Sequence, residues 1–247
     1  MNSVPSVSSL SISDIIVSYG KARVLHGIKF DVAEGETFGL MGLNGAGKTT
    51  LIKTILGLRE PDGGGVSIFG HDRKTDESRS KYAYLPERFD PPWFLSGMEF
   101  LEFSLNLYKV PFSPEGMKDA ARRLSLDPAV LDRRVQTYSK GMRQKLGLMG
   151  TVLTECGLLI LDEPMSGLDP RARAAVKDML IETRAKGKTI FLSSHILADM
   201  DEICDRVGVI HDGYLRYLGP PAGLKAQTGM DHLERAFLKI IDTPVAA

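Results

Sequence analysis

The sequence predicts an α/β fold in which helices flank a mainly parallel sheet, with an antiparallel β subdomain and a helical subdomain attached. Three observations lead to this prediction. An apolar strand over residues 36–41 runs into a glycine-rich loop and then into a helix over 48–58. Strands and helices alternate over residues 158–218, as expected for parallel strands joined by crossover helices. Helical periodicity fills much of residues 95–153, which indicates a separate helical subdomain.

The first half of the chain contains mostly short strand candidates. Alternating or apolar runs over 10–17 and 24–32 flank a Gly-Lys turn and predict a small antiparallel sheet. The helix after the glycine-rich loop is expected to end before the Pro-Asp-Gly turn at 61–63. Further short strands are expected over 66–69 and 82–85.

The second half is expected to pass from helices to alternating strands and helices. The helical subdomain should contain helices over 95–108, 114–124 and 140–153. The following elements should be a strand over 158–161, a helix over 170–185, a strand over 189–193, a helix over 196–204, and strands over 207–211 and 214–218. From Gly219 onward two short helices are expected, closed by Pro244.

These elements suggest one multi-lobed domain over residues 9–240, complete in itself, with the helical subdomain inserted at about 88–155. Residues 1–8 are Ser-rich and expected to be flexible, and 241–247 are expected to form a tail. With 247 residues and 43% hydrophobic content, the chain can bury a core. Lys plus Arg and Asp plus Glu both number 31, so no nucleic-acid partner is expected.

The compartment is indicated by the cysteines and by the chain start. Cys156 and Cys204 lack the spacing of a zinc site or a disulfide scaffold, so we expect small buried side chains in a reducing cytoplasm. The first residues lack the basic flank and apolar stretch of a signal peptide, and no apolar run approaches the ~20 residues that span a bilayer. Any membrane association should therefore come through a partner protein.

The glycine-rich loop at 42–49 reads Gly-Leu-Asn-Gly-Ala-Gly-Lys-Thr, which fits the phosphate-binding loop of P-loop NTPases. Small residues let backbone N–H groups wrap around a phosphate at the N-terminus of the next helix. Lys48 would neutralise the β and γ phosphates, and the Thr49 hydroxyl would bind Mg²⁺. The candidate nucleotide-binding residues are Gly42, Leu43, Asn44, Gly45, Ala46, Gly47, Lys48, Thr49 and Thr50. The alternative is a plain strand-to-helix turn.

The apolar strand at 158–161 ends in two acids, Asp162 and Glu163. The carboxyl edge of a parallel sheet is where α/β proteins bind ligands. Asp162 could therefore hold Mg²⁺ through water, and Glu163 could orient or deprotonate the water that attacks the γ-phosphate. The alternative is a helix-capping acid next to a surface acid.

A third motif, Tyr-Ser-Lys-Gly-Met-Arg-Gln at 138–144, opens a helix for which Ser139 is a natural N-cap. Gly141 permits close approach of another group to the backbone. Considered alone, the motif is a weak signal and is more simply explained as an ordinary capped helix. Its position just before the two-acid strand favours a functional interpretation.

These motifs, in this order, resemble those of the ATP-binding-cassette (ABC) family of transporter ATPases, and the resemblance covers nearly the whole chain. It implies that Glu163 is the catalytic glutamate, that His195 contacts the γ-phosphate and that Tyr19 stacks on adenine. It also places Asp169 in a loop that contacts a second subunit. Tyr19 could instead pack on a strand face, Asp169 could merely cap a helix, and His195 could be structural.

The signature helix departs from the family's usual Leu-Ser-Gly-Gly-Gln, because Tyr138, Lys140 and Met142 replace three of its residues. Ser139 and Gly141 remain. In the family this segment completes the ATP site of the opposite subunit, which implies a head-to-tail pair of chains, expected here as a homodimer. Lys140 could add a cation near the phosphates or remain solvated.

A second departure is Glu87, which stands where the family usually has glutamine. Its oxygens could still bind Mg²⁺, and the metal set implied is then Thr49, Glu87 and Asp162. The alternative for Glu87 is a surface acid. The loop that follows contains Trp93 and Phe94, where the resemblance places the groove for a membrane partner, although these side chains could also pack in the helical subdomain.

The resulting hypothesis is an ATP-hydrolysing transporter subunit at the cytoplasmic face of the cell membrane, bound to a separate transmembrane permease. ATP and Mg²⁺ are its expected cofactors, and Lys48, Glu163 and His195 its expected catalytic residues. The form of the motifs looks most like the ABC-2 type exporter subfamily. One alternative is a soluble ABC ATPase of translation or nucleic-acid maintenance, although the chain shows one cassette and no long heptad arm. A non-hydrolysing regulatory cassette is disfavoured by Glu163 and His195.

Overall fold

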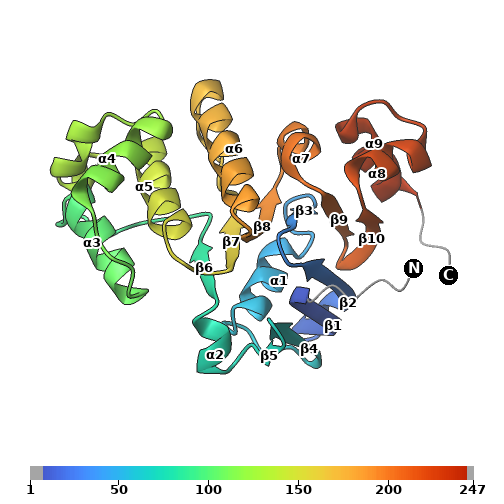
Figure 1. The fold of residues 1–247 in the computed structure, drawn as a ribbon. Coiled ribbons are helices and arrows are strands. Elements are labelled where there is room, and N and C mark those ends of the chain that lie inside the picture. Colours follow the sequence, from blue (N-terminus) through green and yellow to red (C-terminus); the bar gives the residue numbers. More distant parts are fainter. Residues whose placement is uncertain (1–7, 244–247) are drawn as a thin grey trace, which may run out of the picture.

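The computed structural model describes residues 8–243, which form two β-sheets surrounded by helices (Figure 1). The strands of the central sheet are β3 (Thr37–Met41), β6 (Tyr82–Leu85), β7 (Leu158–Asp162), β8 (Thr189–Ser194), β9 (Arg206–His211) and β10 (Tyr214–Gly219). Their order is β10-β9-β3-β8-β7-β6, and every neighbouring pair is parallel except β9 and β10. The predicted α/β fold with a mainly parallel sheet is confirmed.

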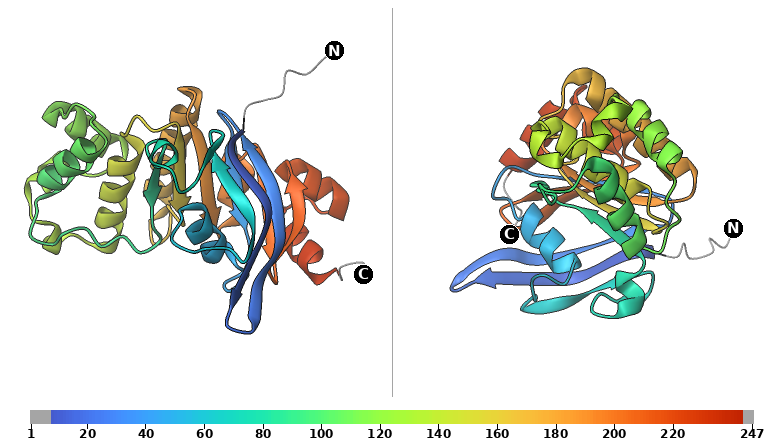
Figure 2. Two further views of the ribbon diagram at one scale, coloured as in Figure 1. Left: turned by 90° about the horizontal axis from the view of Figure 1, so that it is seen from below. Right: turned by 90° about the vertical axis from the view of Figure 1, so that its left-hand side faces the viewer.

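The second sheet is antiparallel, and its β1-β2 hairpin is seen edge-on in Figure 2. Its strands are β1 (Ser8–Tyr19), β2 (Ala22–Ala33), β4 (Gly63–Ile68) and β5 (His71–Asp72), in the order β2-β1-β4-β5. β4 begins inside the predicted turn because Gly63 pairs with Ile16 of β1. Gly64 adopts φ +83°, and a Cβ there would lie 2.2 Å from the carbonyl oxygen of Ser13. Glycine therefore allows the strands to approach where the sequence predicts a turn.

The helical subdomain lies to one side of the central sheet (Figure 1, green to yellow). Its helices are α3 (Gly97–Leu107), α4 (Pro114–Arg123) and α5 (Lys140–Val152), with short 3-10 turns at Pro128–Asp132 and Val135–Thr137. α3 begins two residues later than predicted because Ser96 and Glu99 form a capping box at its N-terminus. The proposed domain boundaries near 88 and 155 stay a prediction.

The remaining helices pack around the two sheets. They are α1 (Lys48–Ile55), α2 (Asp76–Arg79), α6 (Pro170–Ala185), α7 (Leu197–Ile203), α8 (Pro221–Thr228) and α9 (Leu233–Asp242). α1 is shorter than predicted because Gly57, at φ +71°, ends the helical path. The predicted pair of C-terminal helices is present as α8 and α9, whereas Pro244 and residues 1–7 lie outside the described part of the chain. None of the helices in residues 8–243 has the length and apolar content to cross a bilayer.

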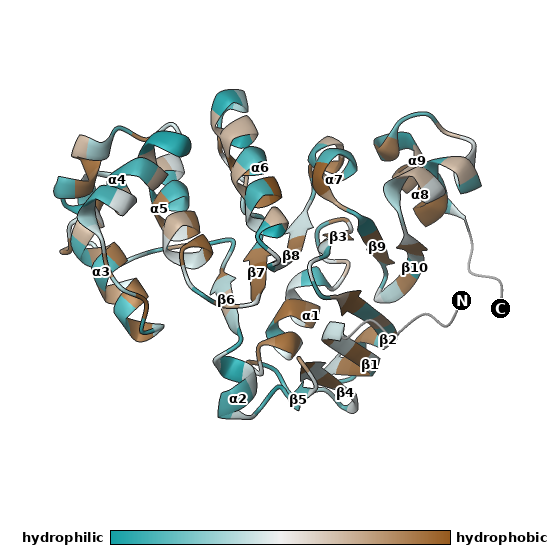
Figure 3. Ribbon diagram, in the orientation of Figure 1, coloured by the Kyte–Doolittle hydropathy of each residue, from teal (hydrophilic) through white to brown (hydrophobic). Residues whose placement is uncertain are grey.

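Both faces of the central sheet are buried, as expected for parallel strands. Leu158 and Ile160 of β7 face the cluster shared with the antiparallel sheet and α1, whereas Leu159 and Leu161 face the cluster shared with the other helices. Figure 3 shows the apolar residues (brown) along β3, β7 and β9. The carboxyl ends of β3, β7 and β8 meet at one edge, which positions the site described next.

Candidate nucleotide-binding and hydrolysis site

The loop between β3 and α1 is shaped by its glycines. Gly45 and Gly47 adopt φ values of +84° and +110°, and a Cβ on Gly42 would lie 2.6 Å from the carbonyl oxygen of Ile210. The first N–H groups of α1 have no partners within the helix and can therefore bind an anion. The Lys48 ammonium group donates to the carbonyl oxygens of Gly42 (2.7 Å) and Leu43 (3.2 Å), so the loop folds around it.

The two acids at the carboxyl end of β7, Asp162 and Glu163, are linked through Ser193 on the neighbouring strand β8. The Glu163 N–H donates to the Ser193 hydroxyl at 3.0 Å, and that hydroxyl donates to Asp162 at 2.5 Å. The Asp162 side chain is buried, and burial raises its pKa, as do the charges of Glu87 and Glu163. The Ser193 hydrogen bond and Lys48 act in the opposite direction. A buried carboxylate of this kind favours a nearby cation.

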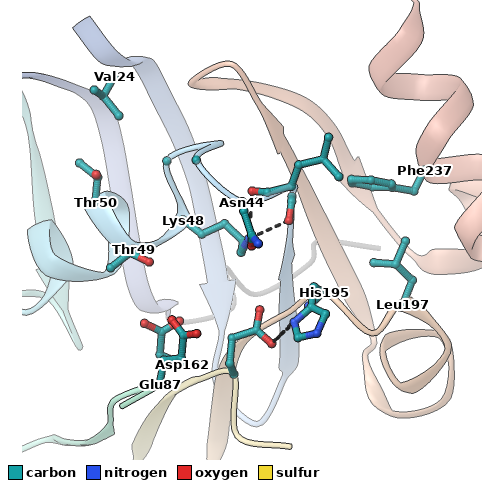
Figure 4. Close-up of a pocket in the computed structure, with 15 residues that line it drawn as sticks. Val24, Asn44, Lys48, Thr49, Thr50, Glu87, Asp162, His195, Leu197 and Phe237 are labelled. Atoms are coloured by element: carbon teal, nitrogen blue, oxygen red, sulfur yellow. Dashed lines mark hydrogen bonds and ion pairs between the residues drawn. The ribbon is translucent and has the colours of Figure 1, made fainter. Parts of the chain in front are cut away.

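Glu163 points toward His195. Its Oε2 lies 2.7 Å from His195 Nδ1 and accepts a second hydrogen bond from the His195 backbone N–H at 3.3 Å. Glu163 has φ +50°, which is uncommon for a residue other than glycine. Figure 4 marks the Glu163 interaction with a dashed line at His195.

One cavity of about 380 Å³ contains most of these groups. Its lining residues are Val24, Gly42, Leu43, Asn44, Gly45, Gly47, Lys48, Thr49, Thr50, Glu87, Asp162, Glu163, His195, Leu197 and Phe237. Burial lowers the pKa of Lys48, while the charges of Glu163, Asp162 and Glu87 raise it. The cavity therefore places one cation among three carboxylates, in the arrangement that phosphoryl transfer uses.

The donor set fits Mg²⁺ held jointly with a nucleotide. Thr49, Glu87 and Asp162 line the same cavity, and they offer one hydroxyl and two carboxylates. Within residues 8–243, His, Cys, Asp and Glu form no cluster of three or more that could hold a metal. Mg²⁺ is commonly bound by one or two carboxylates together with water and substrate phosphates. The metal set of Thr49, Glu87 and Asp162 stays a prediction, to which nucleotide phosphates would add oxygen ligands.

Glu87→Gln is expected to raise the Mg²⁺ concentration needed for half-maximal ATP hydrolysis by about three- to tenfold, because one negative charge leaves the metal site. A Mg²⁺ titration of the initial rate at fixed ATP measures this. Glu102→Gln removes an exposed charge on α3 and serves as the control. An unchanged Mg²⁺ requirement in the Glu87 variant would remove Glu87 from the metal set.

Ala46 of the phosphate loop is buried and does not line this cavity, and four further predicted residues lie outside it in the single chain. Tyr19 is 47% exposed, and the Arg59 guanidinium covers its ring at 4.5 Å, so adenine stacking stays a prediction. Ser139 caps α5 by accepting the Met142 N–H at 3.2 Å. Asp169 caps α6 by accepting the Ala172 N–H at 2.9 Å. The fourth is Gly141, in the first turn of α5. Roles across a subunit interface stay predictions for the last three positions.

Sequence reasoning did not single out Ser193 as a linking residue, or Val24, Leu197 and Phe237 as cavity residues. Asp162 lies opposite Ser193 in the β7–β8 register, and no local sequence signal gives that register. Nothing in the local sequence identifies the other three, since only packing brings them to the loop.

A sequence model of the ABC transporter family, described as "ABC transporter", matches residues 25–166, more than half of the chain. The chain belongs to the ABC transporter family. The predicted resemblance to that family is confirmed. An ABC-type transporter ATP-binding protein of Bacillus subtilis is 33% identical over 91% of this chain and 92% of its own length.

The names of two further relatives include the word export. A Nod factor export ATP-binding protein of Paraburkholderia xenovorans is 33% identical over 92% of this chain and 76% of its own length. A fluoroquinolones export ATP-binding protein of Mycobacterium tuberculosis is 36% identical over 87% and 72%. An uncharacterized ABC transporter ATP-binding protein of Nostoc is 38% identical over 79% of this chain, which spans 59% of that protein. This chain also spans 56% of an uncharacterized ABC transporter ATP-binding protein of Synechocystis.

Solved structures support the same family. A structure described as the ATP binding subunit of an ABC transporter superposes with a TM-score of 0.86, at 33% identity, and covers 94% of this chain and 99% of its own. A dimeric ATP-binding cassette bound to ADP and Pi superposes with a TM-score of 0.76 over 85% of this chain and 98% of its own. At 19% identity, the second likeness is one of fold.

Proposed function

We propose that this ABC ATPase hydrolyses ATP as one half of a pair of chains and thereby drives export through a separate membrane-spanning permease. The observation that supports this most is the single cavity in which the phosphate loop, Asp162, Glu163 and His195 converge. The printed names of two relatives, for a Nod factor and for fluoroquinolones, support export as the direction.

Each of the main residues that line the cavity has its own role in hydrolysis. The Lys48 ammonium group leaves the loop carbonyls of Gly42 and Leu43 and binds the β and γ phosphates. Thr49, Glu87 and, through water, Asp162 would hold Mg²⁺, which would supply charge neutralisation at the same phosphates. Glu163 takes the proton of the attacking water. His195 donates from Nδ1 to Glu163, and a contact with the γ-phosphate would use an Nε2–H donor, which requires hydrogen on both ring nitrogens.

A second chain would complete each site. Ser139, Gly141 and Asp169 lie outside the cavity of the single chain, at the starts of α5 and α6, where their helix ends could face a neighbouring subunit. A head-to-tail pair with two-fold symmetry would bring the start of α5 from one chain to the phosphate loop of the other. ATP then favours the closed pair, and hydrolysis reopens it.

Contact with the permease is proposed at the loop before α3, which would place the ATPase at the cytoplasmic face of the membrane. Trp93 and Phe94 are 66% and 52% exposed, with their rings 5.8 Å apart. They border a shallow groove that also includes Val135, Gln136 and Arg143. Exposed aromatics beside an arginine are typical of the centres of protein interfaces.

The protein purified from detergent-solubilised membranes of its own cells is expected to carry a stoichiometric multi-helix membrane protein. Trp93→Ser with Phe94→Ser should reduce the recovered partner at least about tenfold, because buried aromatic anchors dominate interface energies. Leu58→Ser, which removes an exposed side chain next to α1, is the control. Recovery of ribosomes or nucleic acid without a membrane protein would overturn the proposal.

A further inference from the structure

The C-terminal helix α9 reaches the nucleotide cavity through one aromatic side chain. Phe237 lines the cavity together with Leu43 and Leu197, and only 4% of it is exposed. Figure 4 shows its ring beside Leu197, across the cavity from Thr50. The hydrolysis chemistry proposed above makes no use of this residue, although its side chain borders the phosphate loop.

Phe237 also packs with the helix that follows His195. Leu197 is the first residue of α7, and Ile196 is the only residue between it and His195. Leu197 and Phe237 belong to one apolar cluster, which also contains Met200 and Ile203 of α7. Ile196 provides no side-chain cap for α7, so the start of this short helix depends on tertiary packing.

Polar contacts hold α7 from two sides. From α6, Arg173 donates to the buried Asp199 at 2.7 Å. From α8, Lys225 pairs with Asp201 at 2.8 Å, and α9 is tied to α8 because Lys239 donates to the Thr228 carbonyl at 2.6 Å. Of the side chains that α8 and α9 present, Phe237 is the one that both packs in this cluster and lines the cavity.

We propose that Phe237 is a positioning residue for ATP hydrolysis. By packing beside Leu197 it sets the start of α7, and this keeps His195 Nδ1 within 2.7 Å of Glu163. The segment after β10 is therefore part of the hydrolysis site as well as of the core. The inference rests on the proposed hydrolytic role of Glu163 and His195. Loss of the ring would leave an apolar void into which α7 can shift.

Phe237→Ala is expected to lower kcat about tenfold or more, since small displacements of catalytic groups cost large factors in rate. The Kd for ATP should change less than about threefold, because the phosphate loop is retained. Ile241→Ala is the matched control: Ile241 is buried in the same helix and the same cluster but does not line the cavity. Its kcat should stay within about twofold of the parent. Phe237→Leu, which fills part of the space, should recover part of the rate but stay below the Ile241→Ala protein.

Two readouts separate positioning from general destabilisation. Thermal midpoints of all three variants are measured beside kcat, and parallel losses of both in the Phe237→Ala and Ile241→Ala proteins would overturn the proposal. If Phe237→Ala fails to fold, Phe237→Leu decides: a lower kcat than that of Ile241→Ala supports positioning, and an equal or higher one overturns it.

Amide exchange over residues 195–203 needs no turnover, and in the Phe237 variants it should be faster than in the Ile241 variant. Equal exchange would overturn the proposal, whereas absent ATP hydrolysis in the parent protein would reject only the proposed function.

Discussion

Replacing Glu163 with glutamine is expected to lower steady-state phosphate release by about 10²- to 10⁴-fold. The change keeps the shape of the side chain and removes the carboxylate that would accept the proton of the attacking water. ATP binding should be retained, because Lys48 and the phosphate loop are untouched. The bound nucleotide should then hold two chains together, since the reopening step is blocked.

The measurement is phosphate release from the purified variant, combined with the molecular mass in the presence of ATP and Mg²⁺. Glu102→Gln, an exposed glutamate on α3, controls for the loss of one negative charge. Equal rates for the Glu163 variant and the parent would remove Glu163 from the catalytic set, and hydrolysis would then require another base.

Replacing Lys48 with alanine is expected to weaken ATP binding by about 10- to 100-fold and to abolish measurable hydrolysis. The ammonium group is buried and bonded to two loop carbonyls, so its removal takes away both a charge-assisted phosphate contact and a support of the loop. Burial already lowers the Lys48 pKa, and a bound phosphate would offset that effect by favouring the charged form.

Calorimetric titration with ATP in the presence and absence of Mg²⁺ measures this effect. Lys53→Ala is a suitable control because Lys53 is an exposed lysine on the same helix. Equal ATP affinity in the Lys48 variant and the parent would contradict the phosphate contact. The two variants should therefore differ in ATP affinity, because the Glu163 variant retains ATP binding and the Lys48 variant loses it.

Short contiguous motifs could be located from the sequence because their geometry is local. The loop at 42–49 needs its glycines for positive φ values, and Lys48 follows at a fixed distance along the chain. Asp162 ends a wholly buried strand, so its place at the sheet edge follows from the strand itself. Ser139 forms the expected cap of α5 for the same local reason.

Contacts between distant segments could not be located in this way. The Ser193 hydroxyl links Asp162 and Glu163 only because β8 pairs with β7 in a particular register. The sequence left open whether Trp93 and Phe94 are exposed. Their place depends on a contact within the helical subdomain, in which the Val135 N–H donates to the carbonyl oxygen of Leu95. Each case requires a partner residue whose position no local pattern specifies.

The sequence by itself determined the types of the longer elements, the phosphate loop and the carboxylates at the sheet edge, because backbone preferences and apolar periodicity act over a few residues. It did not indicate the short elements β5 and α2. The tertiary structure alone decided the strand order, the early start of β4 and the approach of α9 to the ATP site. These depend on pairing and close packing between segments far apart in the chain. Phe237 lies near the end of the sequence, yet it lines the same cavity as Val24.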